Sequence, residues 1–245
     1  MTDLLYLPDG DYEKEFDAEV EKRKQTPDET RDGYLVLDRT LFYKEGGGQP
    51  ADHGKISWNS SSVEVVDVQK EHGEVRHYVE GEELPEPGTE VHGKIDWERR
   101  YRLMRMHTAQ HVISKVVLDE YNASTAGNQI HEDYSRIDFK PVEFDESDVE
   151  KIEKLANSRI EEELDVEKKM MSRERLEAEV EEGRTNLDLI PDNIDPLRAV
   201  IIGEDDVCPC GGTHVNNTGE IGEIRIVDRV SKGAEVERLE FELEE

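Results

Sequence analysis

The sequence has few cysteines and no long apolar run. Its two cysteines, Cys208 and Cys210, lie in one short motif of a 245-residue chain, which excludes a framework of disulfide bonds. No stretch approaches the roughly 18 consecutive apolar residues that a membrane-spanning helix needs. Residues 1–9 also lack the basic start and the apolar core of a secretory signal. These absences predict a soluble, cytoplasmic protein.

Apolar residues and positive charge are both scarce. Hydrophobic residues make up 34% of the chain, against about 45–50% in typical soluble domains when glycine is counted. The chain has 31 basic and 61 acidic residues, for a net charge of −30. Such a composition favours disorder, but regular apolar patterns continue along most of the chain. We therefore predict a folded core inside an intensely acidic surface, as expected for a cytosolic protein of a high-salt organism.

If the acidic surface is an adaptation to salt, the protein should unfold or lose activity when potassium chloride is removed. Without salt, the repulsion among the excess acidic side chains, which give the chain a net charge of −30, is no longer screened. Circular dichroism over a potassium chloride titration measures this dependence. Unchanged stability in dilute buffer would contradict the interpretation.

The first part of the chain has the pattern of short β-strands. No strand is predicted in residues 1–30, but strand-like runs bounded by turn residues follow at 33–43, 54–58, 63–68, 74–79 and 89–95. This spacing predicts a small antiparallel barrel or sandwich over residues 1–96. Between the first two runs lies Gly46-Gly47-Gly48-Gln49, where consecutive glycines allow the backbone to approach a ligand closely.

The second part of the chain mixes helices and strands. A helix is predicted from about residue 97, a second from a capping box at 147–150 to about 164, and a third at 172–180. Strands are predicted at 136–140, 198–203, 219–230 and 235–243, with a loop at 122–128. The fold class is therefore α+β, with a barrel domain over 1–96 and a two-layer domain over 97–245.

Two separated motifs contain the side chains that bind zinc. His107 and His111 are four residues apart in a helical segment, so their imidazoles share one face about a turn apart. Cys210 and His214 have the same spacing and flank two glycines. Each motif alone is ambiguous, because ordinary buried histidines, an inert thiol or a redox pair would fit. Together the four predict a zinc site, with Cys210 rather than Cys208 as the ligand.

The number of ligands leaves the role of the metal open. Four protein ligands are typical of a closed structural zinc site, whereas catalytic zinc keeps one position for water. A catalytic ion would need a loose ligand or a fifth coordination position. In another arrangement, zinc fixes the pocket and orients the substrate while an ordered water attacks.

These motifs resemble a known family. His107-Thr-Ala-Gln-His111 with Cys210-Gly-Gly-Thr-His214 is similar to the editing domain of alanyl-tRNA synthetases and of the free-standing AlaX proteins. Residues 42–52 resemble the glycine-rich motif of the barrel that precedes that domain, and 135–139 and 232–238 also match. The resemblance runs in order along nearly the whole chain. A third glycine and Gln110 depart from the usual pattern without changing a proposed ligand.

The resemblance implies a hydrolase that acts in trans on mischarged tRNA(Ala), with Zn²⁺ as cofactor and no use of ATP. Its substrates would be Ser-tRNA(Ala) and, in some members, Gly-tRNA(Ala), and the glycine-rich barrel fits the medium class of the family. The implied zinc ligands are His107, His111, Cys210 and His214. The implied substrate contacts are Gly46, Gly47, Gly48, Gln49, Thr108 and Gln129. No catalytic side chain is implied, because a zinc-positioned water would attack.

Binding of tRNA conflicts with a net charge of −30, since phosphates are usually neutralised by Lys and Arg. Four arginines precede the histidines and Lys115 follows them; the four are Arg99, Arg100, Arg102 and Arg105. Such a cluster is often a solvated helix face, and our hypothesis is that it holds the tRNA acceptor stem. The alternative function is a non-catalytic, zinc-stabilised tRNA-binding module. A fragment of a complete synthetase is disfavoured, because no segment resembles an ATP-binding aminoacylation core.

Overall fold

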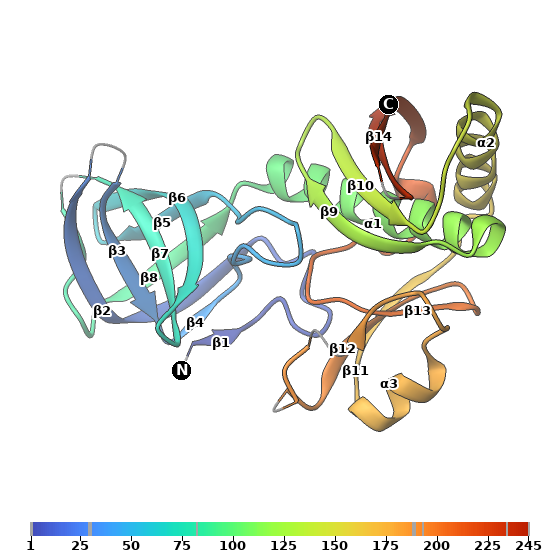
Figure 1. The fold of residues 1–245 in the computed structure, drawn as a ribbon. Helices are drawn as coiled ribbons and strands as arrows, with labels where there is room; N and C mark the ends of the chain where they lie inside the picture. Colours follow the sequence, from blue (N-terminus) through green and yellow to red (C-terminus); the bar gives the residue numbers. More distant parts are fainter. Residues whose placement is uncertain are drawn as a thin grey trace. The chain divides into compact units, whose positions relative to one another are not determined.

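The computed structural model describes residues 2–28, 31–81, 83–187, 190–192, 194–233 and 235–244. It divides into two compact units (Figure 1). Unit 1 comprises Met1–Gly46 and Pro50–Tyr101, and unit 2 comprises Gly47–Gln49 and Arg102–Glu245. The boundary lies within helix α1 (Trp97–Tyr121), whereas the sequence placed it just before this helix. Three residues of the glycine-rich segment therefore pack with unit 2.

Unit 1 is a closed antiparallel barrel with the strand order β2-β3-β7-β6-β5-β8. This confirms the predicted barrel. The strands are β2 (Glu15–Asp28), β3 (Arg31–Leu37), β5 (Gly54–Trp58), β6 (Ser61–Glu71), β7 (Glu74–Glu80) and β8 (Glu90–Ile95). A short parallel pair, β1 (Asp3–Leu4) and β4 (Arg39–Thr40), completes the unit.

Strand β2 was not predicted, although its sequence contains the strand period. Phe16, Ala18 and Val20 are buried in the barrel core, and the acidic residues between them are exposed. This is the alternation that a half-buried strand requires. The small Ala18 and the surrounding charges hide it in a sequence this acidic.

Unit 2 contains two antiparallel sheets and the larger part of α1. The four-stranded sheet has the order β14-β15-β10-β9, and the three-stranded sheet has the order β11-β12-β13. The strands are β9 (Ser124–Ile130), β10 (Ser135–Lys140), β11 (Val166–Met171), β12 (Leu197–Ile202), β13 (Asp206–Pro209), β14 (Glu223–Gly233) and β15 (Val236–Glu244). The mixed α+β class is thus confirmed.

The helices of unit 2 pack on these sheets. Helix α2 (Glu146–Glu161) lies on β14, where the Asn157 side chain bonds both backbone groups of Ile224 at 2.8 Å. Helix α3 (Arg173–Glu179) packs its buried Leu176 on β12. A short 3-10 turn, η2, spans Thr218–Glu220.

Two local predictions in unit 2 were wrong. The predicted loop at 122–128 is largely strand β9, which pairs with β10 through its backbone. Its small and polar residues carry no apolar alternation, so the sequence gave no signal for a strand. The capping box of α2 is formed by Asp145 and Asp148 instead of residues 147 and 150: the Asp148 N–H donates to Asp145 at 3.0 Å, and the Asp145 N–H donates to Asp148 at 2.9 Å.

Helix α1 is buried on most of its circumference within unit 2. Leu103, Met104, Val112, Ile113 and Val117 are all fully buried, and the metal-motif histidines lie among them. The rest of unit 2 thus surrounds most of this part of the helix, which leaves no broad polar face. Buried polar side chains on such a helix need partners.

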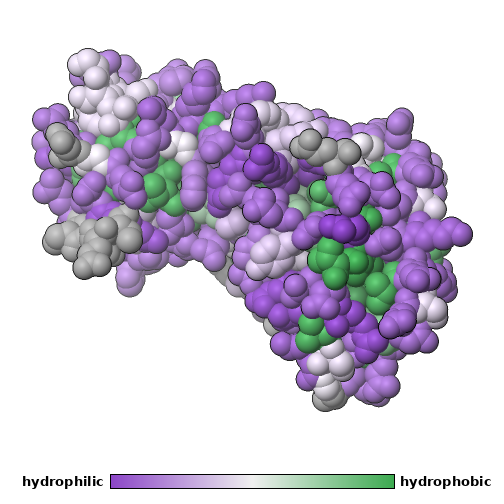
Figure 2. All heavy atoms as spheres, turned by 90° about the horizontal axis from the view of Figure 1, so that it is seen from above, coloured by the Kyte–Doolittle hydropathy of each residue, from purple (hydrophilic) through white to green (hydrophobic). Residues whose placement is uncertain are grey.

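Hydrophilic residues cover most of the face drawn in Figure 2, in keeping with the 61 acidic residues of the sequence. In the described parts of the chain, no helix is long and apolar enough to cross a membrane.

The barrel contains a fully buried histidine whose protonation should weaken unit 1. His77 Nδ1 donates to the Leu35 carbonyl at 3.2 Å, and Nε2 accepts from the Thr40 hydroxyl at 2.8 Å. Burial lowers the pKa of His77 to about 4, whereas the unfolded chain binds the proton near pH 6.5. Stability is therefore complete above about pH 6.5 and falls by roughly 3 kcal/mol as the pH drops to about 4.

Tryptophan fluorescence during urea unfolding can measure this loss, because both tryptophans, Trp58 and Trp97, lie in unit 1. His77→Gln should flatten the dependence of unfolding free energy on pH between 6.5 and 4. His72→Asn, at an exposed turn position with a φ of 51°, should keep the wild-type dependence. Equal slopes for wild type and His77→Gln would contradict the assignment.

Candidate metal centre

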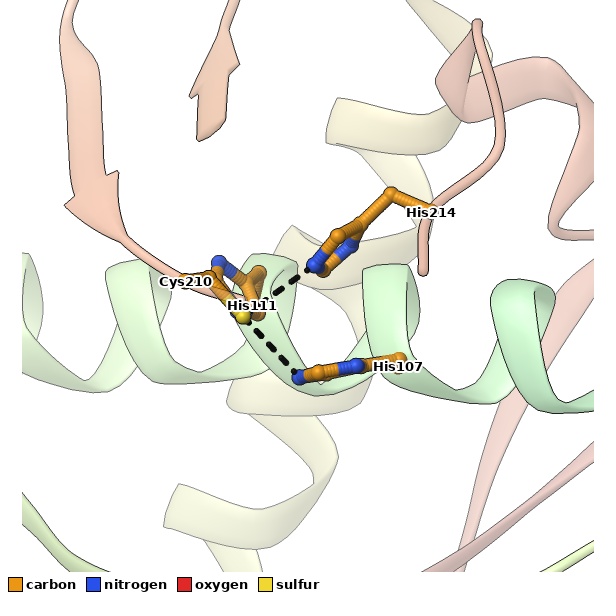
Figure 3. Close-up of side chains that lie close together, drawn as sticks. All are labelled: His107, His111, Cys210 and His214. Carbon is orange, nitrogen blue, oxygen red and sulfur yellow. Dashed lines mark hydrogen bonds between the residues drawn. The ribbon is translucent and has the colours of Figure 1, made fainter. Parts of the chain in front are cut away.

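The four predicted ligands converge in unit 2 (Figure 3). Helix α1 supplies His107 and His111, and the segment after β13 supplies Cys210 and His214. One potential ligand atom from each of the four lies within 4.8 Å of the others. Cys210 Sγ lies 3.3 Å from His214 Nε2 and 3.5 Å from His107 Nε2. A tetrahedral ion with bonds of about 2.0–2.3 Å separates its ligand atoms by about 3.3–3.8 Å. Both sulfur–nitrogen distances fall in this range, and the four residues together could hold one metal ion.

Cys208 lies outside the cluster. Its thiol is buried in β13 and donates to the Pro209 carbonyl at 3.7 Å. Burial raises the pKa of Cys208 to about 12, so this sulfur stays protonated at neutral pH. A protonated thiol is a poor metal ligand.

The second glycine of the Cys210–His214 segment lets the segment lie on the ring of His107. A Cβ atom at Gly212 would lie 2.1 Å from His107 Cε1 and 2.4 Å from its Nδ1. A Cβ atom at Gly211 would meet no heavy atom within 4 Å. The two adjacent glycines therefore differ in role: Gly212 permits the close approach that brings Cys210 to the histidines.

The hydroxyl of Thr108 orients His214. It donates to the Met104 carbonyl at 2.8 Å and accepts from the Val215 N–H at 3.2 Å. Since its one proton is used, the hydroxyl accepts from His214 Nδ1 at 3.2 Å. His214 Nδ1 then carries the ring proton, and Nε2 faces Cys210. These bonds fill the hydrogen-bonding capacity of a fully buried hydroxyl, so we assign Thr108 to the support of His214 rather than to substrate.

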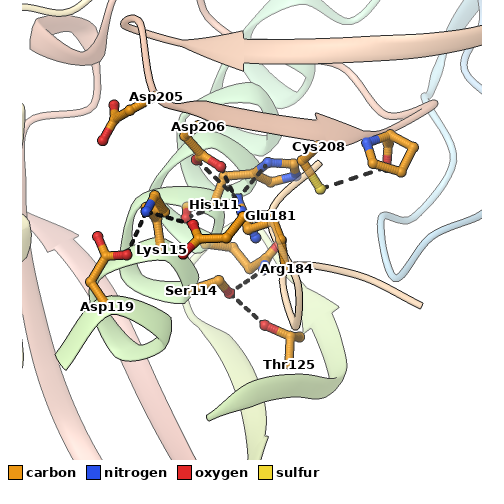
Figure 4. Close-up of polar contacts among 12 residues, drawn as sticks. His111, Ser114, Lys115, Asp119, Thr125, Glu181, Arg184, Asp205, Asp206 and Cys208 are labelled. Carbon is orange, nitrogen blue, oxygen red and sulfur yellow. Dashed lines mark hydrogen bonds and ion pairs between the residues drawn. The ribbon is translucent and has the colours of Figure 1, made fainter. Parts of the chain in front are cut away.

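Two buried arginines, which the sequence did not single out, lie beside the ligands. Arg184 pairs with buried Asp206 at 2.6 Å, and its Nη2 lies 3.3 Å from the His111 carbonyl and 3.4 Å from His111 Nδ1 (Figure 4). Arg198 donates to the carbonyls of Cys210 and Gly212. No spacing in the sequence marks either residue, because their partners are backbone carbonyls and a distant carboxylate.

Burial and these positive charges keep the histidines neutral. Burial foremost, and then the charge of Arg198, lower the pKa of His107 to about 3. Burial likewise lowers the pKa of His111 and of His214 well below the ordinary value, with further contributions from neighbouring arginines and histidines. A neutral imidazole is the form that binds a metal ion.

The structure distributes the predicted substrate residues between the two units. In unit 1, the Gly46 carbonyl accepts from the Tyr43 hydroxyl at 2.8 Å. In unit 2, Gly48 has a φ of +85°, and its carbonyl accepts from the Ile130 N–H at 2.8 Å. Gln129, on β9, accepts a hydrogen bond from Arg136 and is partly exposed. Gln49 is fully buried.

The predicted tRNA-contacting arginines have different environments. Arg100 is fully buried in unit 1, where it pairs with Asp52 and donates to the carbonyls of Asp11 and Leu41 at 2.9 and 2.7 Å. A guanidinium enclosed in this way cannot contact a phosphate, so the prediction for Arg100 is corrected. Lys115 is also buried and pairs with Asp119 and Glu181 (Figure 4).

The other arginines are more accessible. Arg99, in unit 1, is half-buried and donates to the Ala51 carbonyl at 3.2 Å. In unit 2, Arg102 is exposed, and Arg105 donates to the Ile221 carbonyl at 2.9 Å. Arg102 and Arg105 line a hollow of about 270 Å³ together with Met106, Glu132, Asp133 and Leu243.

Comparison with known proteins identifies the family of the chain. A family described as tRNA synthetases class II (A) matches residues 11–99, and one described as the threonyl and alanyl tRNA synthetase second additional domain matches residues 197–240. The alanyl-tRNA editing protein AlaX-M of Methanosarcina barkeri is 41% identical over 99% of both chains.

Longer relatives contain the same region. The alanyl-tRNA editing protein AlaX-L of Pyrococcus horikoshii is 36% identical over 98% of this chain and 58% of its own length. The alanine–tRNA ligase of Halobacterium salinarum is 42% identical over 98% of this chain and 26% of the ligase. The chain belongs to the AlaX-M family of alanyl-tRNA editing proteins, which confirms the resemblance drawn from its motifs.

Alanine substitutions at the adjacent glycines Gly211 and Gly212 test the metal centre, because only Gly212 packs against His107. Gly212→Ala should weaken zinc binding by about tenfold or more, because the added methyl group displaces the His107 ring. Gly211→Ala should bind zinc as the wild type does. Competition with a chromophoric chelator measures both affinities. Equal affinities for the two variants would contradict the packing of Gly212 against His107.

Proposed function

We propose that this protein is a trans-editing hydrolase of the cytoplasm that deacylates mischarged tRNA(Ala), with Ser-tRNA(Ala) as its main substrate and Gly-tRNA(Ala) as a second. The observation that carries this proposal is the buried cluster of three histidines and Cys210, in a chain that aligns end to end with alanyl-tRNA editing proteins. The first part, the barrel, would support the second, which would be the deacylase domain.

The cluster suits zinc through its three imidazoles and one thiolate sulfur, a donor set of borderline softness. Zinc bound there would supply a Lewis acid that polarises the ester carbonyl or acidifies a water molecule. His107, His111, Cys210 and His214 would hold the ion. The buried guanidinium groups of Arg184 and Arg198 would add positive charge near the oxyanion that develops as the ester is attacked.

A polar wall beside the ligands suits discrimination between serine and alanine. On α1, Gln110 directly precedes His111 and Ser114 lies three residues after it, and the Gln110 side chain donates to the Ser114 hydroxyl at 2.8 Å. From β9, Thr125 donates to Ser114 at 2.8 Å and Asn128 donates to Gln110 at 3.3 Å. A pocket that bonds the serine hydroxyl leaves buried polar groups unpaired when alanine enters, which disfavours alanine strongly. Gly46, Gly47, Gly48 and Gln129 remain proposed contacts of the aminoacyl end.

For the tRNA itself, we retain Arg99, Arg102 and Arg105 as proposed phosphate contacts. Arg102 is the most exposed of these three residues. The chain around it has a net charge of −30, so such a cation is a rare contact for a phosphate. In concentrated salt, where we propose that the protein works, screening weakens such contacts. Shape and hydrogen bonding would then carry more of the binding.

The alternative proposal is a non-catalytic module in which zinc only stabilises a tRNA-binding fold. The presence of four protein ligands around one position favours it, since closed sites are typical of structural zinc.

The two proposals differ in the release of serine from preformed Ser-tRNA(Ala). Editing predicts rapid release by the zinc-loaded protein, little release of alanine from Ala-tRNA(Ala), and loss of activity in His107→Ala. A folded, zinc-loaded protein that binds tRNA without releasing serine would support the module instead.

In the same assay, Arg102→Glu should raise the KM for Ser-tRNA(Ala) about fivefold at moderate salt without changing zinc content. Arg175→Glu, the same charge change at an exposed residue of α3, is the control.

A further inference from the structure

Gln49 contacts both halves of the metal centre. Its side chain is fully buried, and its residue packs with unit 2. The Thr213 backbone N–H donates to Gln49 Oε1 at 3.0 Å, and Gln49 Nε2 donates to the Thr213 hydroxyl at 2.9 Å. A backbone N–H can only donate, so the atom facing it is the amide oxygen. The orientation of the amide is thereby fixed.

The fixed amide determines which nitrogen of His107 carries the proton. His107 Nδ1 lies 2.8 Å from Gln49 Oε1. An amide oxygen only accepts, so Nδ1 donates, and the lone pair of the neutral ring is on Nε2. Nε2 is the nitrogen that lies 3.5 Å from Cys210 Sγ, at the candidate metal position.

We infer that Gln49 is a positioning residue for the metal centre: it holds His107 in the Nδ1–H tautomer and ties the glycine-rich segment to the Cys210–His214 segment. The inference rests on the proposed metal site and assigns the glycine-rich segment a supporting role in addition to contact with substrate.

The glycines on both sides of this contact fit that role. Gly48 holds the segment against β9, because its carbonyl accepts from the Ile130 N–H and a Cβ atom there would lie 2.5 Å from Asn128 Oδ1. A Cβ atom on Gly212 would lie 2.8 Å from Gln49 Oε1, so Gly212 leaves room for the bond to His107. Partners that orient a ligating histidine typically contribute about 10- to 100-fold to metal affinity.

Two substitutions separate the acceptor role of Gln49 from its volume. Gln49→Met keeps the length of the side chain but leaves the His107 and Thr213 N–H groups without an acceptor. Gln49→Glu keeps an acceptor oxygen and should restore binding. We expect zinc affinity, measured by chelator competition at pH 7, to fall about 10- to 100-fold in Gln49→Met and to stay within a few-fold of wild type in Gln49→Glu. Gln69→Met, in the barrel, is the control.

The tautomer provides a second measurement that does not depend on activity. Long-range ¹H–¹⁵N spectra of the zinc-loaded wild type should show a protonated Nδ1 and a metal-bound Nε2 for His107. A protonated Nε2, or wild-type zinc affinity in Gln49→Met, would overturn the inference alone. Failure of the folded wild-type protein to bind zinc would overturn the metal site and the inference together.

Discussion

The packing of Gly212 against the ring of His107 is the contact on which the metal centre depends. It brings the Cys210–His214 segment onto a helix about a hundred residues earlier, so that a sulfur and three imidazoles share one small volume. Two of the four side chains are then fixed by hydrogen bonds from outside the cluster, His107 through Gln49 and His214 through Thr108. The fold itself therefore orients the rings of His107 and His214.

Buried arginines lie next to the candidate metal centre of a chain that is acidic as a whole. The surface belongs to a chain of net charge −30, while Arg184 and Arg198 lie buried next to the ligands. Burial and these cations keep the histidines neutral. Ion pairs are also enclosed in both units, Arg100–Asp52 in unit 1 and Arg184–Asp206 in unit 2. Removing one partner of such a pair typically costs about 3–5 kcal/mol, because a buried charge is left alone.

Sequence patterns predicted the barrel and the ligands better than they predicted the roles of nearby residues. Period-two alternation is a local property, so most barrel strands were predictable. In β2 the apolar alternation is weak, because Ala18 is small and many of the residues around it are charged. Strand β9 has no apolar period and exists through its pairing with β10. Side-chain types and their spacing are also local, which is why the four residues of the candidate metal centre could be named. Burial is not local: Gln49, Thr108 and Arg100 were singled out as contacts for substrate or tRNA, and the fold encloses all three.

The most direct measurement is X-ray absorption at the zinc edge on protein that has been loaded with zinc and freed of excess metal. We predict one zinc ion per chain, with one sulfur at about 2.3 Å and nitrogen neighbours at about 2.0–2.1 Å. One sulfur beside nitrogen neighbours is the shell expected of Cys210 and the histidines, which converge in the structure. Substoichiometric zinc, or a coordination shell without sulfur, would contradict the metal centre and the proposed function built on it.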